Sequence, residues 1–166
     1  MGEYMEKIRI DMRERTPEEQ AMYDKQAQLM FKLNHTMPRT EEYMSVLKEL
    51  LGDRIGEGSY VAAPISGAAI DKLVIGKNVF INSNFLAMAR GGIVIGDNVA
   101  IAANVQLLSN NHDPYDRDIL TCKPIHIGMR VLERKLGILS QKAPDHALVF
   151  LAREGAGGIY QHAAGL

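Results

Sequence analysis

The sequence is poor in cysteine and in aromatic residues. Among its 166 residues there is one cysteine, no tryptophan, and an aromatic share of 6%. The single cysteine, Cys122, excludes an internal disulfide framework and any CxxC motif for metal binding or redox chemistry. At this length the chain suffices for one domain with a sizeable core, or for one domain with an appendage.

The chain also lacks the charge excess and the long apolar runs of proteins that bind nucleic acids or membranes. Its 19 Lys and Arg residues oppose 20 Asp and Glu residues, so there is no net basic field. No apolar run approaches the roughly 18 residues of a membrane span, and the first ten residues, MGEYMEKIRI, contain no apolar signal-peptide core. We expect neither nucleic acid nor a membrane as partner, and a cytoplasmic location.

Residues 1–54 carry almost all of the helix signals. Thr16–Glu19 (Thr-Pro-Glu-Glu) is a capping box with proline at the first helical position, and an approximate apolar stripe follows it. Thr40 caps a second amphipathic stretch, which Gly52 ends. Short helices of this kind are unstable alone, so both are expected to cover another surface.

Residues 55–128 have a different composition, in which glycine, asparagine and small aliphatic residues replace the helix formers. An Ile-Gly pair recurs every 20 residues, at Ile55, Ile75 and Ile95. Around these pairs the chain divides into hexads, for example Ile-Gly-Asp-Asn-Val-Ala from Ile95 onward. Each hexad has an aliphatic residue first, glycine or a small residue second, and usually asparagine fourth.

This six-residue period predicts the stacked coils of a parallel β-helix. The aliphatic residue marks the inward corner of a short strand, and glycine and asparagine supply the backbone angles of the following turn. Three hexads make a coil of about 18 residues, so a 20-residue interval is one coil with two extra residues. We expect inward corners at Ile55, Ile75, Ile81, Ile95 and Ile101. Antiparallel hairpins are the alternative, but they have no reason for a six-residue period.

One interval of the repeat is longer than the others. From Ile95 to Ile127 the chain runs 32 residues, and the excess lies in a polar insertion at about residues 109–123. Loops held on a rigid scaffold carry function more often than the scaffold does. Functional residues are therefore expected in this insertion, which contains His112.

Four features follow one another along residues 9–128. They are Asp11-Met12, the Leu-Asn-His-Thr-x-Pro segment from Leu33, the Ile-Gly-x-Asn-Val hexads, and an Asn-x-His-Asp loop followed by Lys-Pro-Ile-x-Ile-Gly from Lys123. A single hexad is a weak signal, whereas the ordered set is specific. It resembles the hexapeptide-repeat acyltransferases, in particular the galactoside and maltose O-acetyltransferase group.

The resemblance implies a mainly β fold, a left-handed parallel β-helix that is an exception to the right-handed crossover rule. It divides the chain into an N-terminal helical segment (1–54), the β-helix (55–128) with its inserted catalytic loop, and a tail (129–166). It also implies an enzyme, an acetyl-CoA-dependent O-acetyltransferase that acts on a hydroxyl of a sugar or similar small acceptor. Acetyl-CoA is then the co-substrate and no metal is expected. Family members pack as trimers with each active site between two subunits, so a homotrimer is expected.

The resemblance also assigns three site residues. His112 falls on the catalytic histidine of the family, which takes the proton from the acceptor hydroxyl. Asn82 and Asp11 match residues that bind the acceptor. The alternatives are a solvated loop histidine, an asparagine stacked on its neighbours in the coils, and an ordinary exposed acid.

The tail departs from the family, in which further coils hold acetyl-CoA. Continuing the six-residue phase places Glu133 and Asp145 at inward corners, where their charges would be buried unpaired. The residues predict an irregular or helical tail, with one helix over 129–142 and another opening near Pro144. Such a tail is that of a truncated or frame-shifted member, and it leaves the residues that bind acetyl-CoA unassigned.

Two other functions stay open at this point. The first is a catalytically impaired or inactive hexapeptide-repeat subunit without the coils that bind CoA. The second is a metal-dependent hydratase like the γ-class carbonic anhydrases, which share the β-helix and hold zinc with three histidines. His112 and His126 supply two ligands, but His35, in the N-terminal segment, is no convincing third.

Overall fold

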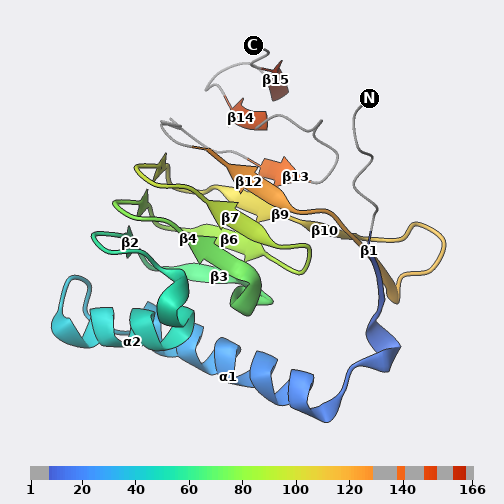
Figure 1. Cartoon of the computed structure of the whole chain (residues 1–166), viewed down its shortest axis with the longest axis horizontal. Coiled ribbons are helices and arrows are strands. Elements are labelled where there is room, and N and C mark those ends of the chain that lie inside the picture. The colour runs from blue at the N-terminus through green and yellow to red at the C-terminus, as the bar shows by residue number, and fades with distance from the viewer. Residues whose placement is uncertain (1–7, 129–137, 141–147, 153–158, 164–166) are drawn as a thin grey trace.

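The computed structural model describes residues 8–128 and three further strands, β13 (Ile138–Ser140), β14 (Leu148–Ala152) and β15 (Ile159–Ala163). Its body is a column of stacked coils whose short strands form parallel sheets (Figure 1). Two helices lie across one end of this column. The predicted β-helix with an N-terminal helical segment is thereby confirmed.

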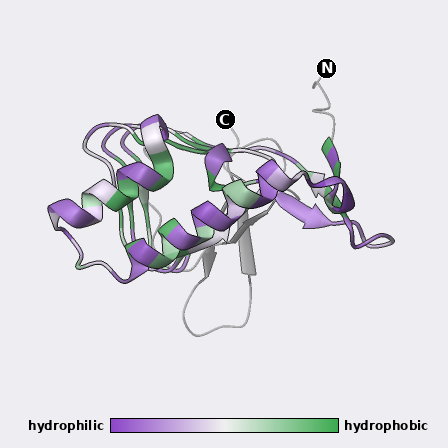
Figure 2. Ribbon diagram, turned by 90° about the horizontal axis from the view of Figure 1, so that it is seen from below, coloured by the Kyte–Doolittle hydropathy of each residue, from purple (hydrophilic) through white to green (hydrophobic). Residues whose placement is uncertain are grey.

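The helices begin and end where the sequence places their signals. Helix α1 (Pro17–Asn34) starts with the capping box, in which Thr16 and Glu19 each accept a hydrogen bond from the other's backbone N–H. Thr40 caps α2 (Glu41–Leu51), and Gly52 ends that helix with a positive φ of 59°. Figure 2 shows both helices from outside the column, with many hydrophilic residues on their outer side.

Three parallel sheets form the sides of the column. Ile75 pairs with Ile95 and Ile95 pairs with Ile127, so the 32-residue interval is one coil plus the insertion. The strands of the three sheets are β2 (Tyr60–Val61), β5 (Phe80–Ile81) and β8 (Ala100–Ile101); β3 (Ile65–Ala68), β6 (Phe85–Met88), β9 (Gln106–Leu108) and β13; and β4 (Leu73–Ile75), β7 (Ile93–Ile95) and β12 (Ile125–Ile127). Three short 3-10 helices connect other elements, namely η1 (Met12–Glu14), η2 (Gly52–Arg54) and η3 (Ile70–Lys72).

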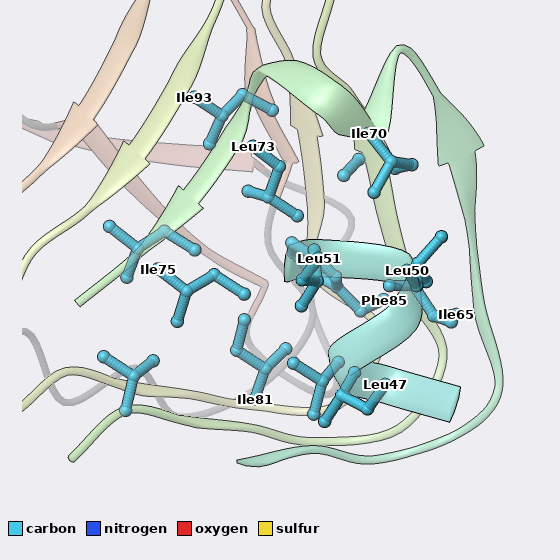
Figure 3. Close-up of a cluster of buried hydrophobic side chains, with 14 of the residues drawn as sticks. Leu47, Leu50, Leu51, Ile65, Ile70, Leu73, Ile75, Ile81, Phe85 and Ile93 are labelled. Atoms are coloured by element: carbon cyan, nitrogen blue, oxygen red, sulfur yellow. The ribbon is translucent and has the colours of Figure 1, made fainter. Parts of the chain in front are cut away.

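The core is the inside of the column together with the inner faces of α1 and α2. Of the five isoleucines predicted to point inward, four are buried. Ile55 is only half-buried, because the first coil has a stacked neighbour on one side alone. Figure 3 shows α2 side chains lying against those of the first coils, including Leu47, Leu50, Leu51, Ile65, Ile70 and Phe85. The helix thus covers the apolar end of the column, which would otherwise be open to water.

The turns between hexads use the asparagines that the repeat predicts. Asn78, Asn84, Asn98 and Asn104, each at the fourth position of a hexad, have a positive φ between 53° and 63°. Asparagine tolerates this left-handed conformation better than other residues with a side chain. The amide of Asn78 also donates to the side-chain oxygen of Asn98 in the next coil at 3.4 Å, and Asn84 donates to Asn104 in the same way.

The tail differs from the irregular or helical segment expected there, because strands occupy the parts that the structure describes. Strand β13 pairs in parallel with β9 and places Leu139 opposite Leu107, the same 32-residue step that separates Ile127 from Ile95. The coil repeat therefore extends beyond residue 128, and Ile138–Ser140 pairs with the open edge of β9 instead of belonging to the helix that the apolar spacing suggested. β14 pairs antiparallel with β15. The rest of the two predicted helices lies outside the described residues.

Candidate functional site

The insertion forms a β-hairpin that projects from the side of the column. Strand β10 (Asn110–His112) pairs antiparallel with β11 (Ile119–Cys122), and β11 also pairs with β1 (Ile8–Asp11). Figure 1 shows β1 and the hairpin together, on the side of the column away from β2. Strand β1 is not predicted from the sequence, because a four-residue strand with two charged side chains gives no strand signal without its partner.

His112 is the last residue of β10, and its side chain is exposed. The ring atom Nδ1 lies within hydrogen-bond distance of the carbonyl oxygen of Arg117, across the hairpin turn. A carbonyl oxygen only accepts hydrogen bonds, so Nδ1 carries a proton and donates it, and in the neutral ring Nε2 is then the unprotonated nitrogen. An exposed imidazole with a free Nε2 is in the state that a general base needs.

Both carboxylate oxygens of Asp11 are engaged by Arg13. Atoms Nε and Nη2 of Arg13 donate to Oδ1 and Oδ2 of Asp11 at 2.8 and 2.6 Å, the two-point contact that a guanidinium favours. These side-chain hydrogen bonds lower the pKa of the Asp11 carboxyl below its ordinary value. An acceptor hydroxyl that binds Asp11, as the family resemblance implies, therefore has to share the carboxylate with Arg13.

Asn82 lies at the turn after β5, with an exposed side chain whose Oδ1 accepts a hydrogen bond from the Ser83 N–H at 2.8 Å. Its sheet, which begins at β2, is on the opposite side of the column from β10 in Figure 1. A single chain therefore does not bring Asn82 to His112. The structure brings Asp11 and His112 onto one small sheet and leaves Asn82 apart.

Sequence reasoning missed the charged residues that tie β1 to the hairpin. Atom Nη1 of Arg9 donates to Oδ2 of Asp113 at 2.8 Å, and Nη2 of Arg13 donates to Oδ2 of Asp116 at 3.2 Å. Hydrogen bonds from the Tyr115 backbone and then from Arg9 lower the pKa of the Asp113 carboxyl. The acids of the insertion are visible in the sequence, but their partners lie more than 100 residues away.

The described residues form neither a metal-ligand cluster nor a membrane-spanning helix. Within them, no group of three or more His, Cys, Asp or Glu residues is arranged to hold a metal ion. No helix in the described part of the chain has the length and apolar character needed to cross a membrane.

No protein-family model matches the chain. The chain is 33% identical over 107 residues to the galactoside O-acetyltransferase of Escherichia coli (strain K12), which corresponds to 64% of this chain and 51% of that protein. It thus spans about half the length of this curated relative.

Solved structures with the same fold include a hexapeptide-repeat acetyltransferase from Vibrio cholerae, with a TM-score of 0.61 and 27% identity over 67% of this chain and 64% of that chain. A galactoside acetyltransferase in complex with coenzyme A has a TM-score of 0.61 and 26% identity over 67% and 57% of the two chains. A structure from Vibrio cholerae O1 biovar eltor, complexed with acetyl coenzyme A, has a TM-score of 0.60 and 26% identity over 66% and 61%. The column described above is therefore the left-handed β-helix of such proteins.

Proposed function

We infer that this chain, whose sequence and β-helix make it a member of the hexapeptide-repeat acetyltransferases, transfers an acetyl group from acetyl-CoA to a hydroxyl of a small acceptor. The relatives supply the reaction class. The observation that carries the proposal for this chain is the hydrogen bond from His112 Nδ1 to the Arg117 carbonyl, which leaves Nε2 free as a base.

In this proposal His112 moves one proton from the acceptor to the leaving sulfur. Acetyl-CoA supplies an acetyl group already activated as a thioester. Nε2 of His112 accepts the hydroxyl proton as the acceptor oxygen bonds to the acetyl carbon, and the imidazolium returns that proton to the sulfur when the C–S bond breaks. The Arg117 carbonyl stabilises the imidazolium, because the Nδ1 hydrogen bond strengthens when the ring is charged. No covalent enzyme intermediate is needed, and the buried Cys122 takes no part.

The acceptor is proposed to be a sugar or similar hydroxyl compound, bound by Asp11 and Asn82. Because Asn82 and His112 lie on opposite sides of one column, a complete site requires a second copy whose β2–β5–β8 side faces the hairpin of the first. This geometry supports a homotrimer with sites between subunits. We assign no residue of the described chain to acetyl-CoA.

Replacing His112 by alanine tests the base. With acetyl-CoA and a panel of sugars, we expect kcat for release of the CoA thiol to fall by about 10²–10⁴-fold, the range for loss of a general base. His35 is a matched control, because it is exposed and its Nδ1 contacts the Phe31 carbonyl at 2.7 Å. His35→Ala should leave kcat within about twofold. An unchanged rate in His112→Ala would overturn the assignment.

Calorimetric titration of the full chain with acetyl-CoA separates this function from that of an impaired subunit. An active transferase binds acetyl-CoA with and without His112, because the base is not needed for binding. A chain that neither binds acetyl-CoA nor releases thiol from it is the impaired subunit.

A further inference from the structure

We propose that Arg9 and Asp113 position His112, by holding the β10–β11 turn in the shape in which the Arg117 carbonyl accepts the Nδ1 proton. The proposal rests on the proposed role of His112 as general base and adds two residues to it. Both are positioning residues, because they act on His112 through the backbone of the turn and not on the acceptor.

Asp113 connects the turn to the strand at the start of the chain. Its Oδ1 accepts hydrogen bonds from the backbone N–H groups of Tyr115 and Asp116 at 2.9 and 3.3 Å. Its Oδ2 accepts from Arg9 of β1 at 2.8 Å. The Asp113 side chain is only 12% exposed, whereas that of Arg9 is 58% exposed. An enclosed carboxylate depends on its partners, so loss of Arg9 disturbs the turn more than an ordinary surface ion pair would.

The Arg117 carbonyl lies between two fixed points of the backbone. Before it, Asp116 accepts hydrogen bonds from the N–H groups of Asp118 and Ile119, through Oδ1 at 3.1 Å and its carbonyl oxygen at 3.0 Å. After it, the Asp118 carbonyl accepts from the Met12 N–H at 2.9 Å. Because peptide groups are planar, holding both neighbours sets the direction of the Arg117 carbonyl.

The direction of that carbonyl decides which nitrogen of His112 is free. An exposed imidazole without a partner populates both tautomers and several ring orientations. Only the form with the proton on Nδ1 presents Nε2 as the base. When Arg9 or Asp113 is removed, we expect kcat to fall about 10-fold from lost orientation, with KM for acetyl-CoA changed less than about twofold.

The test uses the full chain, with nitrogen NMR of the His112 ring beside steady-state kinetics. The natural chain should show the proton on Nδ1, and Arg9→Ala and Asp113→Asn should show a mixture of tautomers. The double variant should lose no more kcat than either single variant, because both remove one interaction. Arg9→Lys, which keeps the charge, should restore most of the signature. Lys48→Ala is the control, since it breaks an exposed 3.0 Å ion pair with Asp53 at the far end of α2.

Unchanged ring signals in Arg9→Ala and Asp113→Asn would overturn the proposal. Mixed tautomers in these variants with an unchanged kcat would also overturn it. So would a mixture of His112 tautomers in the control Lys48→Ala. The ring spectrum needs no turnover. A chain without acetyl transfer would therefore refute the proposed function while the spectrum still decides the positioning. If Arg9→Ala fails to fold by circular dichroism, Asp113→Asn and Arg9→Lys decide the question.

Discussion

Replacing Gly76 by alanine should destabilise the column sharply, because the coils stack too closely at this position for a side chain. Gly76 is the second residue of its hexad, and its N–H donates to the Ile95 carbonyl at 2.7 Å. A Cβ atom there would lie 2.7 Å from the carbonyl carbon of Gly96 and 2.8 Å from the backbone nitrogen of Asp97. Backbone atoms cannot rotate away as the end of a side chain does.

The cost follows from the displacement that relief requires. Bringing the Cβ contact with Gly96 from 2.7 Å to an ordinary 3.4 Å moves the coils apart by about 0.7 Å. The same movement stretches the hydrogen bond from Gly76 to Ile95 to about 3.4 Å, beyond the useful range. A lost hydrogen bond of about 1 kcal/mol and overpacking of about 2 kcal/mol give a loss of about 3 kcal/mol. For a chain of this length the melting temperature then falls by about 6–12 °C.

Thermal unfolding followed by circular dichroism at one fixed protein concentration measures this shift. Gly128→Ala is the control, because Gly128 has the same position in its hexad, an ordinary φ, and no described atom within 4 Å of an added Cβ. A melting temperature of Gly76→Ala within about 2 °C of the natural chain, or an equal loss in Gly128→Ala, would refute the stacking argument.

Two further predictions concern stability. Tyr43→Phe should cost about 1 kcal/mol in denaturant unfolding, because it removes the 2.7 Å hydrogen bond from the buried hydroxyl to the Val61 carbonyl; Tyr115→Phe, at a fully exposed ring, should cost nothing measurable. The pKa values of Asp11 and Asp113 are lowered in the folded chain, so their stabilisation is complete above the ordinary value of 3.8 and is lost as the pH falls through the lower folded values. The free energy of unfolding should therefore fall more steeply below about pH 4 in the natural chain than in Asp113→Asn; equal slopes would contradict this.

The column could be predicted from the sequence because each of its rules is local. Ile75 and Ile95 mark corners within their own hexads, and Asn78 or Asn98 marks the turn that follows. The capping signals of α1 and α2 are equally local. Repetition every 20 residues then gives the pairing register, which a single strand does not reveal.

Only part of the small sheet around His112 could be predicted, because its strands and ion pairs join residues that are far apart in the sequence. The insertion that holds His112 shows as an interruption of the repeat, but its partner β1 lies at the other end of the described chain. Neither Arg9 nor Arg13 has a local pattern that points to Asp113 or Asp116. The tail shows a related limit, because the apolar spacing that suggested a helix over 129–142 carries no information about the edge of β9, with which Ile138–Ser140 pairs only after the coils have formed.

The pairing of β1 with β11 also sets an order of assembly during synthesis. Ile8 pairs with Cys122, which is synthesised about 110 residues later. At translation rates of about 5–20 residues per second, the interval between the two residues is about 5–20 s. The helices and the first coils involve much shorter separations and have time to form meanwhile. Strand β1 therefore remains without its partner through most of synthesis, and the sheet that holds the proposed base is among the last parts of the described chain to form. Substitutions that weaken β1 should show first as slow acquisition of activity by newly made chains, before the coils themselves lose stability.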